Sequence, residues 1–191
     1  MTASSHSELI LGGARSGKSR HALARARLAA GSVAFVATAS DVDGDMRARI
    51  ARHRAERPAS FTTVEERFDI AATCRRLAAR HELVLVDCLT LWVSNQMERG
   101  DGDQVILAAA DELAGLMKER VVSLVAVSND VGASVHPPTE LGRRFQDLLG
   151  SVNQRVAAAA DCVTLMVAGI PLPIRTALPE PRVHGRSVEA P

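Results

Sequence analysis

The chain has 191 residues, 47% of them hydrophobic and 24% charged, a composition typical of globular proteins with enough chain for one packed domain. Its formal net charge of +1, from 23 basic and 22 acidic side chains, argues against a dedicated nucleic-acid binder, which usually carries a marked basic excess. No apolar run reaches the roughly 18 residues that cross a membrane, and residues 1–7 lack the charged and apolar regions of a signal peptide, so we expect a cytoplasmic protein with no membrane span.

Five short apolar segments predict β-strands. They are continuous runs rather than alternating ones, which is typical of strands buried on both faces in a parallel sheet. Helical patterns lie between them, so the chain is expected to have an α/β fold whose mostly parallel sheet is flanked by helices. Ligands of such sheets bind beyond the carboxyl ends of the strands. The predicted strands are Glu8–Leu11, Val33–Thr38, Leu83–Asp87, Val121–Ser128 and Cys162–Ala168.

The first predicted strand runs directly into the pattern Gly-x-x-x-x-Gly-Lys-Ser at residues 12–19, and a helical stretch follows. This is the context of a phosphate-binding P-loop. Gly12 and Gly17 allow the backbone to turn so that successive N–H groups point at an anion. In this pattern Lys18 reaches the β- and γ-phosphates of a nucleotide, and the Ser19 hydroxyl is a ligand of Mg²⁺.

A histidine lies among arginines in the segment 37–58, ATASDVDGDMRARIARHRAERP. Arg49 and Arg57 flank His53 at four-residue spacing, so the three side chains can share one helix face before Pro58 ends it. Nearby cations favour neutral imidazole, which can attack phosphorus, and they also neutralise a phosphate. An exposed helix whose acids and arginines suit its dipole explains the same pattern, with His53 as a surface residue. His21, three residues after Lys18, is a second candidate near phosphate.

Asp87 ends the apolar run LVLVD. A carboxylate at that end of a strand lies close to the loop after the first strand and can hold a nucleotide-bound metal through water. An aspartate that simply caps the next element is the alternative reading. With the first reading, the two motifs together predict a site for a nucleoside triphosphate and Mg²⁺.

The last third of the chain predicts a helix and a tail. The helix has Leu141, Phe145, Leu148, Val152 and Val156 on one stripe, with Pro138 and Thr139 as start signals. From Pro171 the chain has five prolines and little periodicity, which predicts a C-terminal extension. We place the single P-loop domain at residues 1–175 and a Pro-rich flexible extension at 176–191. The cysteines, Cys74, Cys88 and Cys162, have no C-x-x-C spacing and are expected to be small buried thiols.

Several of these blocks, in this order, resemble the bifunctional adenosylcobinamide kinase / adenosylcobinamide-phosphate guanylyltransferase family of cobalamin biosynthesis. The resemblance extends over about residues 8–175. Three positions depart from it: Asp130 stands where the family often has Glu, Phe61 where Trp is common, and Arg52 where some relatives have a second histidine. The matching blocks are Gly12–Ser19, Ala37–Ala39, His53-Arg54-x-x-Arg57-Pro58, Asp87–Thr90, Asn129-x-Val131-Gly132, then Arg143, Phe145, Asp147, Gly150, Asn153 and Gln154, and finally Ala168–Pro171.

The resemblance implies two reactions on a three-layer, RecA-like P-loop fold in a homotrimer. First, GTP or ATP phosphorylates the aminopropanol hydroxyl of adenosylcobinamide. Second, His53 attacks the α-phosphate of GTP, pyrophosphate leaves, and GMP passes to adenosylcobinamide phosphate to give adenosylcobinamide-GDP. It implies His53 and Lys18 as catalytic residues, Ser19 and Asp87 as metal ligands, and nucleotide contacts at Gly12, Gly13, Ala14, Arg15, Ser16, Gly17, Lys18, Ser19, Ala37, Thr38, Ala39, Arg54, Ala55, Glu56, Arg57, Glu65 and Asp87.

Other functions fit parts of the pattern. A plain P-loop small-molecule kinase would use only the γ-phosphate and leave no nucleotide attached to the protein. A non-catalytic nucleotide-dependent switch would use the same loop to control a partner. A nucleic-acid binder acting through residues 47–57 would show steep salt dependence, and the near-neutral charge weighs against it.

Overall fold

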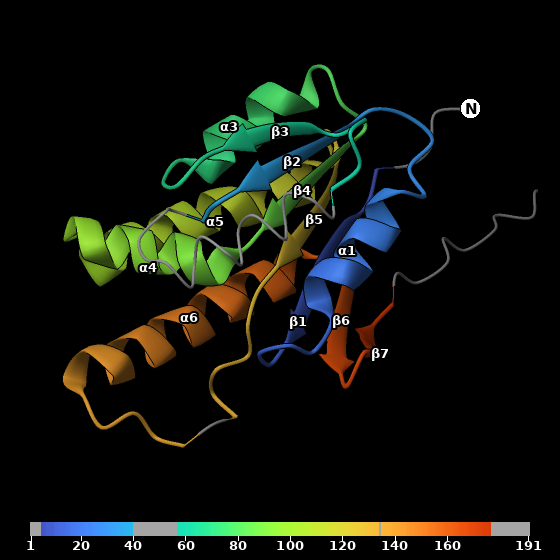
Figure 1. The fold of residues 1–191 in the computed structure, drawn as a ribbon. Helices are drawn as coiled ribbons and strands as arrows, with labels where there is room; N and C mark the ends of the chain where they lie inside the picture. The colour runs from blue at the N-terminus through green and yellow to red at the C-terminus, as the bar shows by residue number, and fades with distance from the viewer. Residues whose placement is uncertain (1–4, 40–56, 134, 177–191) are drawn as a thin grey trace, which may run out of the picture.

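A seven-stranded sheet with the order β3-β2-β4-β5-β1-β6-β7 organises the computed structural model, which describes residues 5–39, 57–133 and 135–176 (Figure 1). Neighbouring strands pair in parallel, except that β7 runs antiparallel to β6. The elements are β1 (Ser7–Gly12), α1 (Lys18–Ala26), β2 (Val33–Ala37), β3 (Thr62–Glu65), α3 (Ile70–Ala78), β4 (Leu83–Asp87), α4 (Leu89–Arg99), α5 (Asp103–Glu119), β5 (Ser123–Val127), α6 (Glu140–Ala159), β6 (Cys162–Val167) and β7 (Ile170–Arg175).

The inner strands of the sheet are buried on both faces, as their continuous apolar runs predict. On one face, alternate strand residues such as Leu9 and Val86 pack with α3, α4, α5 and α6, and Trp92 is fully buried there. On the other face, the intervening residues, Ile10 and Phe35 among them, pack with α1. The three-layer α/β arrangement expected from the sequence is therefore confirmed.

All five predicted strands are present, with small differences in their ends. The largest difference is at β5, which begins at Ser123 rather than at Val121. Arg120 ends α5 in the left-handed conformation, with φ of 52°, and Val121 lies in the turn with 52% of its surface exposed. Val121 therefore belongs to the turn between α5 and β5, and its apolar side chain was no sign of a buried strand position.

Two strands at the edges of the sheet were not predicted. Most of β3 is exposed, so its sequence TTVE has no continuous apolar run. The sequence prediction was wrong in starting the extension at Pro171, because β7 pairs with β6 as far as Arg175. Prolines are tolerated in edge strands, where one side needs no ladder hydrogen bond. The domain limit at residue 175 stays a prediction.

The predicted helix with the apolar stripe is α6. Its first turn is capped by Thr139, whose hydroxyl accepts a hydrogen bond from Gly142 N at 3.1 Å. Leu148, Val152 and Val156 are buried as expected, but Leu141 is 65% exposed, so the prediction was wrong for that residue. The first turn of α6 lies away from the strands (Figure 1), and no sheet surface covers it.

Cys74 is buried and Cys88 and Cys162 are half-buried, and all three are free thiols. Within the described ranges, no helix has both the length and the apolar character to cross a bilayer.

Candidate active site at the carboxyl ends of the strands

The expected nucleotide-binding residues of four strands lie at one edge of the sheet. The register places Ala37 of β2 between Glu65 of β3 and Asp87 of β4. Asp87 is in turn level with Val127 of β5, which is level with Ile10 of β1. The phosphate loop begins two residues beyond Ile10. The topology therefore brings together residues separated by more than 70 positions in the chain, at the edge where such sheets bind ligands.

The loop between β1 and α1 has the backbone that its glycines predict. Gly12 and Gly17 have φ of 152° and 94°, and Arg15 also has a positive φ of 56°. A Cβ atom on Gly12 would lie 2.6 Å from both the Met166 carbonyl oxygen and Ser16 Oγ, so no larger residue fits. Because α1 begins at Lys18, its free N–H groups and the positive end of its dipole face the loop.

Two polar side chains are buried inside this loop. Lys18 is 8% exposed, and its Nζ donates a hydrogen bond to Gly13 O at 2.8 Å. Ser16 is 7% exposed, and its Oγ has no hydrogen-bond partner in the part of the chain that the structure describes. Buried hydroxyls nearly always have a partner, and an anion held in the loop would supply one. The loop is therefore built for an anionic group.

Asp87 and Lys18 lie near the same point of the sheet edge. Burial and, after it, the negative charge of Asp87 raise the pKa of the Cys88 thiol to about 11, while the positive charge of Lys18 acts in the opposite direction. Both charges therefore act on one thiol, although the residues come from different strand–helix units. A carboxylate and an ammonium group in this arrangement suit a phosphate with its metal.

The turn after β2 is tied to β4 and α4. The Thr38 hydroxyl donates to Cys88 O at 2.7 Å and accepts from Cys88 N at 2.8 Å. Asn95 is buried in α4, and its Nδ2 donates to Thr38 O at 2.8 Å. The Thr38 hydroxyl thus holds the strand ends together, while Ala39 is half-buried beside it.

Arg57 stacks over the ring of Phe35 in β2, with its guanidinium carbon 4.0 Å from the ring centroid. The structure does not describe the rest of this predicted basic segment. The expected site residues that fall outside the described residues are His53, Arg54, Ala55 and Glu56. His21 is half-buried in α1, where its backbone N–H donates to Gly17 O at 2.9 Å.

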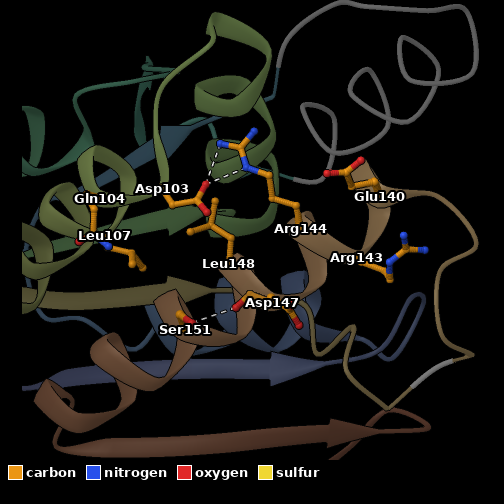
Figure 2. A pocket seen from close by; sticks show the side chains of 9 residues that line it. All are labelled: Asp103, Gln104, Leu107, Glu140, Arg143, Arg144, Asp147, Leu148 and Ser151. Atoms are coloured by element: carbon orange, nitrogen blue, oxygen red, sulfur yellow. Dashed lines mark hydrogen bonds and ion pairs between the residues drawn. The ribbon is translucent and has the colours of Figure 1, made fainter.

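A separate groove of about 420 Å³ lies between the first turns of α5 and α6. Figure 2 shows Arg144 reaching Asp103, with its Nε 2.7 Å from Oδ1, whereas Arg143 points away from this pair. Arg143 donates to the carbonyl oxygens of Pro137 and Pro138. No residue of the phosphate loop lines this groove.

Sequence reasoning gave no role to the polar side chains of α4 and α6 behind the site. Thr90 and Asn153 both bond the backbone of Asn129, which follows β5. Their only signal in the sequence was their place in blocks that match a known family. The contacts join residues at least 24 positions apart, which no local pattern indicates.

A mostly parallel sheet with a glycine-rich phosphate loop between β1 and α1, and an aspartate at the end of β4, defines a P-loop nucleoside triphosphate-binding protein. The chain belongs to the cobinamide kinase / cobinamide phosphate guanyltransferase family, whose model matches residues 8–174. The resemblance found in the sequence is thereby confirmed. Members of this family are bifunctional enzymes, a kinase and a guanyltransferase in one chain.

Three relatives illustrate the similarity, each called a bifunctional adenosylcobalamin biosynthesis protein. That of Pseudomonas aeruginosa, CobP, is 43% identical over 174 residues, covering 88% of this chain and 96% of its own. The CobU proteins of Escherichia coli and Salmonella typhimurium are 36% and 37% identical over 179 residues, each covering 87% of this chain and 98% of their own. Among solved structures, a KaiC-like protein of Pyrococcus horikoshii matches with a TM-score of 0.47 at 14% identity, over 84% of this chain and 70% of that one.

Proposed function

We propose that this chain phosphorylates adenosylcobinamide with a nucleoside triphosphate and then transfers GMP from GTP to the product, giving adenosylcobinamide-GDP and pyrophosphate. The observation that carries this proposal is the buried pair Ser16 and Lys18 inside a glycine loop, close to Asp87, in a chain of the cobinamide kinase family. Both reactions need a triphosphate held in one place with its charge neutralised.

Each expected nucleotide contact has a role in this proposal. The loop N–H groups of residues 12–19 and the Lys18 ammonium hold the phosphates. The family resemblance assigns the other contacts with the guanine nucleotide to Ala37–Ala39, Arg54–Arg57 and Glu65. Phosphate would draw Lys18 Nζ away from Gly13 O, which is 2.8 Å from it. Either GTP or ATP can serve the first reaction, because the loop recognises phosphates rather than the base.

Ser19 and Asp87 would hold Mg²⁺. Hydroxyl and carboxylate oxygens are the hard donors that Mg²⁺ prefers, and this ion is commonly bound through one or two protein ligands, waters and substrate phosphates. Ser19 lies in the first turn of α1 beside Lys18, and Asp87 is half-buried at the end of β4. When bound, the ion stabilises the charge that develops on the phosphates.

His53 is the proposed nucleophile of the second reaction. A neutral imidazole nitrogen attacks the α-phosphorus of GTP, the bond from that phosphorus to the β-phosphate oxygen breaks, and pyrophosphate leaves. A phosphate oxygen of adenosylcobinamide phosphate then attacks the same phosphorus and releases the imidazole. Arg57, four positions along the chain, is anchored over Phe35 of β2.

Labelled GTP tests this proposal. GTP labelled at the α-phosphate is expected to leave acid-labile, alkali-stable label on the protein, and γ-labelled GTP is expected to leave none. His53→Ala should remove the adduct while the kinase reaction continues. Lys18→Ala should weaken both reactions, by roughly 100-fold or more in kcat/KM, because it removes a charge that binds the transferred phosphates.

Two outcomes would contradict the assignment. Label that persists in His53→Ala would move the nucleophile elsewhere, and His21→Ala is the next variant to measure. A protein that phosphorylates adenosylcobinamide but never takes up label from α-labelled GTP would be a plain small-molecule kinase. We further propose that the protein is a cytoplasmic homotrimer whose partners are these small molecules. Sedimentation of the purified chain tests the oligomeric state.

A further inference from the structure

The three residues after Ser128, Asn129–Val131, lie directly beside the phosphate loop. Ile10 of β1 is level with Val127 of β5, and the chain beyond β5 continues alongside the chain beyond β1 as far as Gly12. Two hydrogen bonds continue this pairing past the strands, from Ser128 N to Ile10 O at 3.0 Å and from Asp130 N to Gly12 O at 3.2 Å. The backbone of Asp130 is therefore fixed against the first residue of the loop.

Side chains from two helices hold the same three residues from behind. Thr90 of α4 accepts a hydrogen bond from Asn129 N at 2.8 Å, and Asn153 of α6 donates to Asn129 O at 2.9 Å. Gln146 of α6 donates to Val131 O at 3.1 Å. With the bond to Gly12, four contacts restrain the backbone of three successive residues. Such restraint is what preorganises a reacting group, because its position costs no further ordering.

Asp130 presents a carboxylate from this restrained segment. Its side chain is exposed at the carboxyl edge of the sheet, and Oδ1 accepts a hydrogen bond from Gly132 N at 3.3 Å. A carboxylate has about four acceptor positions, and this contact uses one of them. Asp130 also belongs to the strand unit next to β1, whereas Asp87 is one strand further away.

We propose that Asp130 is the base that accepts the proton of the acceptor alcohol in the kinase reaction. This inference rests on the proposed phosphorylation of adenosylcobinamide. As the alcohol oxygen forms its bond to the γ-phosphorus, its proton moves to the Asp130 carboxylate. The bond from the γ-phosphorus to the β-phosphate oxygen breaks, and the nucleoside diphosphate leaves with its charge neutralised by Lys18.

The two reactions differ in their need for this base. The acceptor of the first reaction is an alcohol, which must lose a proton. The acceptor of the second is a phosphate monoester, which is largely ionised at neutral pH because its second pKa is about 6. Asp130 should therefore matter to phosphorylation and not to guanylyl transfer, a split that loss of nucleotide binding would not produce.

The test compares Asp130→Asn and Asp130→Glu with the wild-type chain in two assays. One follows label from γ-labelled triphosphate to adenosylcobinamide, and the other follows label from α-labelled GTP to prepared adenosylcobinamide phosphate. In Asp130→Asn, kcat for phosphorylation should fall roughly 100- to 10,000-fold with little change in the KM for nucleotide. Guanylyl transfer should stay close to the wild-type rate. Asp130→Glu, which keeps the carboxylate, should recover much of the lost kcat.

Glu112→Gln, an exposed charge change on α5, is the matched control and should leave both reactions unchanged. Phosphorylation at the wild-type rate in Asp130→Asn would overturn the proposal, and so would an equal loss of both reactions. If the wild-type chain itself does not phosphorylate adenosylcobinamide, the proposed function fails, and that result is visible before any variant is measured.

Discussion

Two glycines of the phosphate loop stand where the fold leaves no room for a side chain. Gly12 has Met166 O and Ser16 Oγ where a Cβ would go, and Gly17 has the Gly169 backbone 3.3 Å away from such an atom. The bond from Gly169 N to Ser16 O, at 3.0 Å, joins the loop to the β6–β7 turn. The anion site therefore depends on close approach between the loop and β6.

Gly12→Ala tests this dependence. The variant combines a positive φ with a 2.6 Å clash against a backbone oxygen, so the free energy of unfolding should fall by about 1–3 kcal/mol. Binding should weaken as well. A nucleotide at 100 times its Kd stabilises a protein by about 2.7 kcal/mol, and we expect this increment to disappear. Urea unfolding with and without GTP measures both effects.

Gly115→Ala in α5 is the matched control. A Cβ at Gly115 meets no atom within 4 Å, and alanine is favoured over glycine in helices, so this variant should gain about 0.5–1 kcal/mol. If Gly12→Ala unfolds at the same urea concentration as the wild type and still responds to GTP, the close-packed loop is not required for the site.

At the scale of elements, the sequence predicted what depends on burial over several successive residues. Runs such as LVLVD at β4 are apolar because both faces of the sheet are covered, and the stripe of α6 follows from its packing on one face. The phosphate loop was predictable because its glycines and Lys18 are contiguous. The contacts around Asn129 and the edge strand β7 could not be predicted in this way, because they depend on which distant segments the fold brings together.

Asp161 links the ends of three elements. Its Oδ2 accepts hydrogen bonds from Ser7 N and Ser7 Oγ at the start of β1, and its Oδ1 pairs with Arg120 at the end of α5. Burial alone would raise the pKa of Asp161, but the bonds from Ser7 and Arg120 outweigh it and lower the pKa below its ordinary value. The ionised carboxylate therefore stabilises the folded state.

Asp161→Asn should lower the free energy of unfolding by about 1.5–3 kcal/mol at pH 7, because hydrogen bonds to a charged group are lost. The direction in which this stability difference changes with pH follows from the lowered pKa of Asp161. The wild-type advantage is fully present above the unfolded value near 3.8 and disappears as the pH falls through the lower folded pKa. Urea unfolding of both proteins across the acidic range measures it.

Asp111→Asn gives the comparison at a surface pair. Asp111 is 60% exposed and pairs with Arg155 at 3.1 Å, so its loss should cost at most about 0.5 kcal/mol. A pH-independent difference between the wild type and Asp161→Asn would show that the amide substitution acts through packing and not through charge.

In the whole molecule, the candidate active site lies at the carboxyl ends of the strands. The β6–β7 hairpin forms one side edge of the sheet. Pro171 and Pro173 interrupt the outer strand, which discourages pairing with a further strand. Arg175 at the end of β7 donates to the carbonyl oxygens of Ala157 and Ala160, at 2.5 and 3.1 Å, and so satisfies the C-terminus of α6. The hairpin is therefore part of the folded unit.

Truncation separates this unit from the residues beyond it. A chain ending at Thr176 keeps β7 and the Arg175 contacts, so its urea midpoint should equal that of the full chain. A chain ending at Gly169 loses five cross-strand pairs, each worth roughly 0.2–1 kcal/mol, and also uncovers the carbonyl groups of α6. It should lose about 1–5 kcal/mol of unfolding free energy, measured by urea unfolding of the three proteins. Arg175→Ala in the full chain isolates the contribution of the contacts at the C-terminus of α6. If the chain ending at Gly169 is as stable as the full chain, the folded domain ends before β7, because the core is then complete without that strand.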